Sequence, residues 1–386
     1  MKVAIVHDWL IGLRGGERCL QAFLQLFPEA DLFTLLHVPG STTAEIDARV
    51  KHTSFLQQLP GATRLYRHFL PLYPAAIRRF NFSAYDVVIS LSHAAAKNIS
   101  VPKGVLHFSY CFTPMRYIWD QSRQYFGKAT PFLWPLLSSL RSWDVRASKR
   151  VDCIVAISEF IAARVRCYYN REAEVIYPPV DTSWIEPLKQ WRQGAAFLCA
   201  GALVPYKRID LAVEAFNRLG EPLWIAGSGP EQQRLKRIAK SNITFFGSVS
   251  DQELAGLYRS CRALIFPGTE DFGLMPIECL ASGRPVIARY DGALRETLTG
   301  LKSWESAALE NQDYTGVFIP KRAANEVESL MQGVNFFLER EDRFSAEACS
   351  RHARVFEPSR FFEAWEHLLT QYGVLDRRMV SGYGRG

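Results

Sequence analysis

Two glutamates, Glu270 and Glu278, stand eight positions apart around a segment suited to binding an anion. The apolar run 263–266 predicts a strand before them, and residues 274–281 fit a helix. Free N–H groups at the first turn of that helix, and its dipole, favour a phosphate. These N–H groups belong to Phe272, Gly273 and Leu274. Carboxylates in the same pocket need hydroxyl partners, so the pattern predicts a ligand with phosphate and polyol groups, such as a nucleotide sugar. Glutamates near a helix start are also common caps.

The residues around this pair resemble a known motif. EDFGLMPIE at 270–278, followed by ASGRPV at 281–286, resembles the E-x7-E motif of family 4 glycosyltransferases, which have the GT-B fold. In that family the first glutamate contacts hydroxyl groups of the donor sugar, the second contacts the ribose, and the backbone between them holds the diphosphate. The resemblance implies that Glu270 is catalytic and that Glu278 and the N–H groups bind the donor.

Three further loops in the second half resemble parts of the same family. GALVPYKR at 201–208 resembles the diphosphate-binding loop, with its lysine present as Lys207, which the resemblance makes catalytic. Ala202 stands where relatives carry an arginine, and Arg208 is one residue that could replace the missing cation. The other two loops follow predicted strands and resemble the phosphate-side and base-side loops. Their donor-binding candidates are Gly227, Gly229, Phe246, Gly247 and Val249.

The first half offers fewer chemical candidates. Residues 2–9 read as a buried strand ending in His7 and Asp8, where ligands of open α/β sheets bind. The following loop contains Gly15 and Gly16 but no G-x-G-x-x-G fingerprint. In the resembling family this loop lies near the donor phosphates, although paired glycines also make ordinary tight turns.

A catalytic histidine is expected at the end of the strand 85–91. His93 follows this strand. The segment CFTPMRYIWD at 111–120 resembles a family loop in which a histidine usually precedes Thr-Pro, but this chain has Phe112 there. The departure leaves His93 as the better candidate, with an ordinary structural role as the alternative.

The alternation of strands and helices predicts an α/β fold with doubly wound parallel sheets. The 386 residues suffice for two domains with full cores. The resemblance implies a GT-B architecture of two facing Rossmann-like domains. We expect an acceptor domain at 1–179, a nucleotide-sugar donor domain at 180–355, and a crossing helix and tail at 356–386.

Positive charge is concentrated in residues 51–150, where fourteen Lys or Arg oppose three Asp, a net of +11 within a total of +7. Such a field favours an anionic partner. Residues 51–82 hold no acid and mix basic with aromatic side chains, which suits a membrane-surface element; a core-facing helix pair with a basic outer face is equally compatible. A nucleic-acid partner would not explain the glutamate pair, so none is expected.

Location and cofactors follow from what the sequence lacks. No basic-then-apolar leader precedes residue 3, and the apolar run 132–140 is too short to span a bilayer. We therefore expect a cytoplasmic protein that contacts the membrane peripherally. The eight cysteines form no C-x-x-C pair, and no Asp-x-Asp occurs, so we expect neither a metal nor a cofactor besides the donor.

Together these features predict a retaining glycosyltransferase for cell-surface polysaccharide synthesis. It would move a hexose to a glycan or lipid-linked acceptor, with mannose from GDP-mannose preferred on resemblance alone. Two alternatives stay open. A GT-B sugar-nucleotide epimerase would need no acceptor, and a catalytically degenerate donor-binding partner would explain Ala202 and Phe112.

Overall fold

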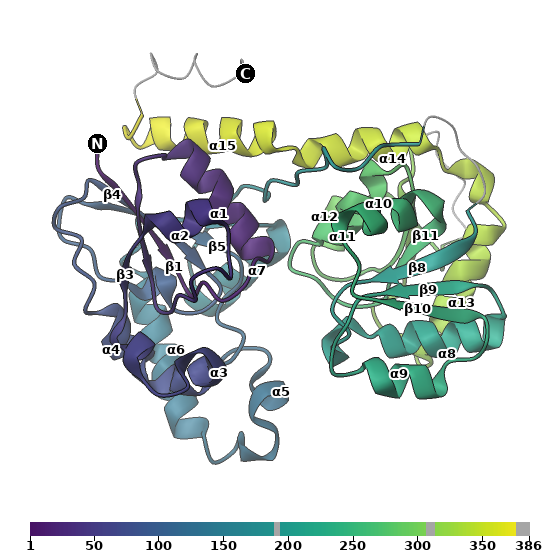
Figure 1. Cartoon of the computed structure of the whole chain (residues 1–386), viewed down its shortest axis with the longest axis horizontal. Helices are drawn as coiled ribbons and strands as arrows, with labels where there is room; N and C mark the ends of the chain where they lie inside the picture. Colours follow the sequence, from purple (N-terminus) through teal and green to yellow (C-terminus); the bar gives the residue numbers. More distant parts are fainter. Residues whose placement is uncertain (189–193, 306–312, 376–386) are drawn as a thin grey trace. The chain divides into compact units, whose positions relative to one another are not determined.

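Two parallel β-sheets organise the chain, one in each of two units (Figure 1). The computed structural model describes residues 1–188, 194–305 and 313–375. Unit 1 comprises Met1–Pro179 and the chain from Phe361 on, whereas unit 2 comprises Val180–Arg360. The α/β fold with parallel sheets predicted from the alternating pattern is confirmed.

In the described part of unit 1, seven strands form one sheet whose neighbours all pair in parallel. Strands such as β1 and β4 are buried along their whole length, as expected for apolar runs covered by helices on both faces. The order reverses between β1 and β4, because β2 and β3 are added on one side of β1 and the later strands on the other. Across the sheet the order is β3 (Val50–Thr53), β2 (Asp31–Thr34), β1 (Val3–His7), β4 (Val87–Ser92), β5 (Leu106–Cys111), β6 (Cys153–Ala156) and β7 (Glu174–Val175).

Helices from both ends of the chain pack together in unit 1. Phe23 of α1 (Gly15–Leu26) lies 5.3 Å and 4.8 Å, between ring centroids, from Phe361 and Trp365 of α15 (Pro358–Gln371). Trp365 is fully buried and also contacts Tyr110 of β5. Unit 1 also contains α2 (Ala44–Arg49), α6 (Trp134–Ser148) and α7 (Glu159–Tyr169), with the 3-10 segment η3 (Ala96–Asn98) after β4.

The segment between β3 and β4 is a chain of short helical turns, where the sequence suggested a helix pair. Gly61 and Pro71 interrupt it, and its aromatic side chains Tyr66, Tyr73 and Phe82 are buried in the core of unit 1. The core-facing alternative therefore describes these aromatics better than a membrane-surface element does. The turns are η1 (Phe55–Gln58), α3 (Ala62–Leu65), η2 (Tyr66–Leu72) and α4 (Tyr73–Ile77).

A buried ionic network anchors η3 to the rest of unit 1. The fully buried carboxylate of Asp144 in α6 pairs with the ammonium of Lys97. It also accepts hydrogen bonds from Asn98 Nδ2 at 2.9 Å, and from Trp119 Nε1 and Tyr169 OH at 2.8 Å each. These four partners together satisfy one buried carboxylate. Removing any of them would leave its charge poorly compensated.

Unit 2 repeats this architecture with a second parallel sheet, seven-stranded in the residues described. The order reverses between β8 and β11. Figure 1 shows α10 (Asp251–Ser260) and α11 (Leu274–Ala281) on one side of the sheet, and α8 (Ile209–Leu219) and α9 (Gln232–Ile238) on the other. Across the sheet the order is β10 (Ile243–Gly247), β9 (Leu223–Ala226), β8 (Ala196–Ala200), β11 (Cys261–Phe266), β12 (Val286–Arg289), β14 (Gly316–Ile319) and β13 (Gly300–Lys302).

The core of unit 2 joins β8 to helices on one face of the sheet. The ring of Phe197 in β8 lies 5.2 Å from that of Phe216 in α8 and 5.9 Å from that of Phe337 in α13 (Glu326–Leu338). Unit 2 also contains α12 (Leu294–Thr297) and α14 (Ala346–Ala353). Of the eight cysteines in the chain, seven are buried and Cys167 is exposed. Within the described ranges, every helix is too short or too polar to span a bilayer.

Folding stability should depend on pH through His107 of β5. This histidine is fully buried, with Nε2 2.9 Å from Ser90 Oγ, and burial, assisted by Arg150, lowers its pKa to about 3. Between a pKa of about 6.5 in the unfolded chain and about 3 in the folded one, only the unfolded state binds the proton. The free energy of unfolding should therefore fall as the pH falls below 6.5, approaching about 1.4 kcal/mol per pH unit.

Urea unfolding of the wild type and His107→Gln at pH 7.5, 6.0 and 5.0 measures this effect. We expect the stability advantage of the wild type to shrink as the pH is lowered. An advantage that stays constant over this range would show that His107 takes up its proton in the folded protein as readily as in the unfolded one.

Candidate active site

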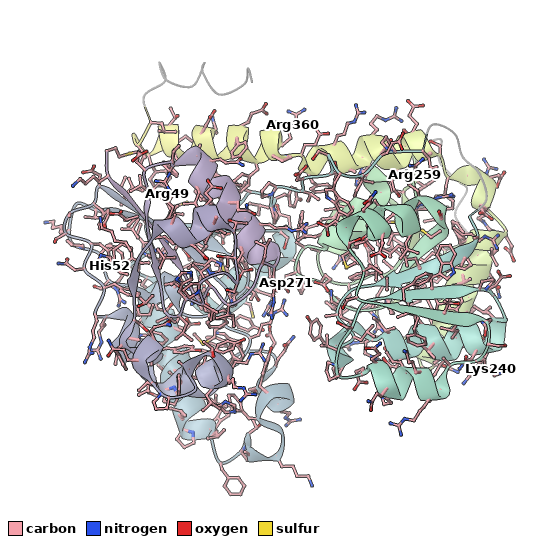
Figure 2. The ribbon with its side chains drawn as sticks, in the orientation of Figure 1. Arg49, His52, Lys240, Arg259, Asp271 and Arg360 are labelled. Carbon is pink, nitrogen blue, oxygen red and sulfur yellow. The ribbon has the colours of Figure 1, made fainter. Side chains whose placement is uncertain are left out.

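Lys207 and Glu270 meet at the point where the strand order of unit 2 reverses. Lys207 ends η5 (Pro205–Lys207), in the loop after β8, and Glu270 lies in the loop after β11. The Lys207 ammonium forms an ion pair with Glu270 Oε1, and the two side chains keep 16% and 17% of their surface exposed. The structure thus brings together two residues that the sequence analysis identified as catalytic. Figure 2 labels Asp271, which follows Glu270 in the same loop.

The environment of Lys207 suits a second, anionic partner. Its Nζ lies 5.1 Å from the centroid of the Phe266 ring, a distance at which the ring attracts a cation. A lysine ammonium has three N–H donors, so it can hold Glu270 and a phosphate oxygen together. The pair can therefore orient a sugar through the carboxylate and a diphosphate through the ammonium.

The N-terminus of α11 follows directly on this loop. Gly273 caps the helix with φ of +96°, a conformation that favours glycine, and a Cβ there would come within 2.8 Å of Leu294 Cδ2. The ring of Phe272 is buried against Phe356, with centroids 5.6 Å apart, so the backbone of Phe272 is the part suited to a ligand. Pro276 has no N–H, which limits the donors of the first turn to the residues before it.

Glu278 lies one turn further along α11 and is held by a neighbouring helix. Its carboxylate is largely buried, and Oε2 accepts a hydrogen bond of 3.0 Å from the hydroxyl of Tyr258 in α10. Burial, followed by the charge of Glu278, raises the pKa of Tyr258 well above its ordinary value, so the phenol keeps its proton and donates. The arrangement fixes the orientation of the carboxylate, as a hydroxyl-binding group requires.

Close backbone contacts hold the loops after β8, β9 and β10 together. A Cβ on Gly227 would lie 1.9 Å from the carbonyl oxygen of Gly201, and one on Gly229 would lie 2.4 Å from that of Leu203. The N–H of Gly227 donates to the Gly247 carbonyl at 2.6 Å. The two Cβ distances explain why the loop after β9 carries glycine at both positions, whereas at Gly247 a φ of +73° favours glycine. The structure thus brings Gly227, Gly229 and Gly247 together.

The end of β10 and the loop that follows it add an aromatic surface. Phe246 keeps 44% of its surface exposed, and its ring lies 5.9 Å from that of Trp224. Ser248 Oγ donates to Ser228 Oγ at 2.9 Å and so joins this loop to the one after β9, while Val249 is half-buried. An exposed ring at a strand end offers a planar base a stacking partner.

The side chain of Arg208 pairs with a different carboxylate, that of Glu326. It has φ of +54°, unusual for a residue with a side chain, and its Nη2 donates to Glu326 Oε2 at 2.8 Å. Arg289 Nη1 donates to the other oxygen of Glu326 at 2.7 Å. Burial alone would raise the pKa of Glu326, but these two arginines outweigh it and lower the pKa. The guanidinium of Arg208 is thus bound to Glu326. Ala202, where relatives carry an arginine, is exposed on the same loop.

In unit 1 the corresponding reversal lies between β1 and β4, where a buried carboxylate shapes the loop of His93. Asp8 Oδ2 accepts from the N–H groups of His93 and Ala94 at 2.7 and 2.8 Å, and Oδ1 from those of Ala95 and Ala96 at 2.6 and 2.7 Å. His93 Nδ1 lies 3.3 Å from Asp8 Oδ2. Desolvation nevertheless outweighs the attraction of Asp8 and lowers the pKa of His93, so its ring is neutral at neutral pH.

His7 is a candidate that the sequence analysis did not select. Its Nδ1 lies 3.0 Å from the carbonyl oxygen of Trp9 and so carries the proton, which makes Nε2 an acceptor. Nε2 is buried without a hydrogen-bond partner among the described residues, and a Cβ on Gly16 would lie 3.4 Å from it. Its place at the end of β1, beside the reversal, was the available signal. His7, His93, Phe112 and the Gly15–Gly16 start of α1 thus form one cluster.

Comparison with known proteins identifies the family. A family described as Glycosyltransferase Family 4 matches residues 14–184, and one described as Glycosyl transferases group 1 matches residues 184–355. The chain belongs to the family 4 glycosyltransferases. The two matches meet at residue 184, so together they cover both units of this glycosyltransferase apart from its ends.

Curated relatives include O-antigen chain mannosyltransferase C of Escherichia coli, 27% identical over 240 residues, which are 57% of this chain and 61% of the relative. A GDP-mannose-dependent α-(1-6)-phosphatidylinositol dimannoside mannosyltransferase of Mycobacterium tuberculosis is 31% identical over 164 residues, 40% of this chain and 39% of the relative. The chain thus spans between about two and three fifths of the length of these relatives.

Solved structures confirm the predicted GT-B fold. Anabaena HepE in complex with UDP has a TM-score of 0.68 at 14% identity, covering 96% of this chain and 100% of that one. Sucrose-phosphate synthase of Thermosynechococcus elongatus has a TM-score of 0.69 at 15% identity, covering 97% and 99%. Among the residues that the structure describes, no group of three or more His, Cys, Asp or Glu could hold a metal ion.

Replacing Gly227 by alanine tests the contact between the loops. The new Cβ would meet the Gly201 carbonyl, so the two loops must separate. We expect the free energy of unfolding to fall by about 2 kcal/mol. Gly256→Ala in α10 is the matched control, because its Cβ would meet nothing within 4 Å and should stabilise the helix by roughly 0.5–1 kcal/mol. Urea unfolding that finds both variants equally stable would contradict the close approach.

Proposed function

We propose that this glycosyltransferase moves a hexose from a nucleoside diphosphate sugar to a glycan or lipid-linked acceptor in cell-surface polysaccharide synthesis. The observation that carries the proposal is the ion pair of Lys207 and Glu270 beside the N-terminus of α11. We take mannose from GDP-mannose as the preferred donor. The names of the Escherichia coli and mycobacterial mannosyltransferases support this choice.

The donor would lie across the loops at the strand ends of unit 2. Its diphosphate would accept hydrogen bonds from Lys207 and from the first N–H groups of α11, whose dipole favours the anion. Glu270 would face the sugar hydroxyls, and Glu278, held by Tyr258, would face the ribose. The exposed ring of Phe246 would support the base.

Transfer would proceed with retention of configuration, the acceptor attacking from the face that the diphosphate leaves. The bond to the leaving oxygen breaks as negative charge grows on the diphosphate, and a fixed cation and helix dipole stabilise that charge. Lys207 supplies the cation, so we propose that no divalent metal is needed. No covalent nucleophile is assigned. In unit 1, the neutral ring of His93 and the lone pair of His7 Nε2 are suited to contact an acceptor hydroxyl.

We place this reaction in the cytoplasm, at an anionic membrane surface. The net charge of +11 in residues 51–150 supports an anionic surface, because a field of one sign attracts the opposite charge. A lipid-linked acceptor would then be reached in the plane of the membrane.

A panel of GDP- and UDP-sugars, each with and without lipid-diphosphate and glycan acceptors, tests the proposal. We expect mass spectrometry to find a hexose added to an acceptor, unchanged by EDTA, and NMR of the product to show the anomeric configuration of the donor. A donor converted without acceptor would instead identify an epimerase. Binding of donors with no product from any pair would identify a degenerate partner protein.

Lys207→Ala should reduce turnover by about 10²–10³, because it removes one preorganised group that stabilises the leaving diphosphate. Arg208→Ala should reduce it less, since Arg208 pairs with Glu326. Ala202→Arg, which restores a cation where relatives carry one, should remain active. Steady-state rates of the three variants decide the point. A Lys207→Ala enzyme as fast as the wild type would exclude this loop as the diphosphate site.

A further inference from the structure

The segment 122–134 of unit 1 exposes three large aromatic side chains within ten residues. Phe132, Trp134 and Tyr125 keep 87%, 55% and 40% of their surface exposed. The segment consists of α5 (Ser122–Phe126), η4 (Gly127–Ala129), the turn 130–133 and the first residue of α6, and we call it the aromatic loop. Single exposed apolar residues are ordinary, but a cluster of aromatics marks an interaction surface.

The aromatic loop rests on a firm base, so its exposed rings are displayed by structure. Leu133, between Phe132 and Trp134, packs against the core of unit 1, and its carbonyl accepts from the N–H of Leu137 at 2.9 Å. Arg141, two turns further along α6, donates to the Ile118 carbonyl at 2.6 Å and lies 4.8 Å from the Trp134 ring. The chain therefore alternates inward and outward side chains at this point.

The charged side chains within residues 121–143 are all basic, and Asp120, which directly precedes this stretch, is paired with Arg164. Residues 121–143 contain Arg123, Lys128 and Arg141 and no Asp or Glu. Arg123 and Lys128 are exposed and line a hollow together with Trp134. The ring of Tyr125 lies 4.5 Å from that of Tyr117, to which Arg67 of η2 is hydrogen-bonded, so a further exposed cation borders the same surface.

This combination matches the chemistry of a bilayer surface. Trp and Tyr favour the boundary between headgroups and acyl chains, because each ring is apolar on one side and polar at its tip. Lys and Arg attract anionic headgroups, at about 1 kcal/mol or fivefold in affinity each. The buried aromatics of 51–82 cannot provide such a contact, whereas the exposed rings of the aromatic loop can.

We propose that the aromatic loop docks this glycosyltransferase on an anionic lipid bilayer, with Phe132 and Trp134 inserting at the interface and Arg123 and Lys128 on the headgroup phosphates. The inference deepens the membrane part of the proposed function by naming its surface. It does not rest on the identity of the donor or on the transfer chemistry.

Sedimentation of the full chain with vesicles tests the proposal. Vesicles of phosphatidylcholine alone are compared with vesicles containing phosphatidylglycerol, at low and high salt. We expect binding to the anionic vesicles that weakens with salt, since exposed charges are screened. The double variant Phe132→Ser, Trp134→Ser should weaken binding by about tenfold or more, because two rings no longer enter the interface. Arg123→Ala and Lys128→Ala should each weaken it by about fivefold.

Matched controls lie in unit 2. Trp304→Ser removes an aromatic that is 43% exposed, and Lys240→Ala removes an exposed lysine that Figure 2 labels; both should bind vesicles as the wild type does. All variants replace exposed side chains, and matching thermal unfolding curves confirm that they fold.

Three results would overturn the docking surface. The first is equal vesicle binding by the aromatic-loop variants and the wild type, and the second is binding that does not depend on lipid charge. The third is self-association without lipid that the double variant abolishes, which would identify a second copy of the chain as the occupant. Transfer to a soluble acceptor, measured in parallel, separates the two proposals. A chain that binds vesicles but transfers no sugar contradicts the proposed function alone.

Discussion

Both candidate clusters depend on one constraint of parallel sheets, the reversal of strand order. Loops that follow neighbouring strands usually lead to helices on the same face of the sheet. At a reversal the two loops lead to opposite faces, which leaves a crevice between them. In unit 2 the reversal lies between β8 and β11, and it brings Lys207 to Glu270. In unit 1 it lies between β1 and β4, and it brings Asp8 to the loop of His93. Two unrelated sets of side chains thus occupy equivalent places in their sheets.

The two clusters are organised by different forces. In unit 2 the loops touch through their backbones, at Gly227 and Gly229, and a charged pair lies beside them. The ion pair with Glu270 holds the Lys207 ammonium in position, so the diphosphate of the proposed function would not have to order a mobile side chain. In unit 1 the carboxylate of Asp8 is consumed by four backbone N–H groups. It holds the loop of His93 in place, beside His7, whose Nε2 has no hydrogen-bond partner among the described residues.

The sequence predicted the regular elements well where the pattern was strong. The predicted helix 274–281 has the bounds of α11, because Gly273 and Gly283 flank it, and the predicted strand 263–266 lies within β11. The edge strand β3 was missed, since four mostly exposed residues show no alternation. Resemblance placed Lys207 and Glu270 in one site, but their direct pairing was not predicted. The hydrogen bonds of Asp8 to the loop of His93 could not be predicted from the sequence. Their donors lie 85–88 residues away and are backbone N–H groups, which any residue type except proline would supply.

The return of the chain to unit 1 has a consequence for biosynthesis. Unit 2 is continuous in sequence, whereas the core of unit 1 includes Phe361 and the fully buried Trp365, which are made only after all of unit 2. On the ribosome, the first 179 residues therefore emerge with the ring of Phe23 still lacking these two partners. Although domains generally fold in order from the N-terminus during synthesis, here the second unit can complete its core before the first. Nascent chains halted before residue 361 should leave apolar surface of α1 open to chaperones.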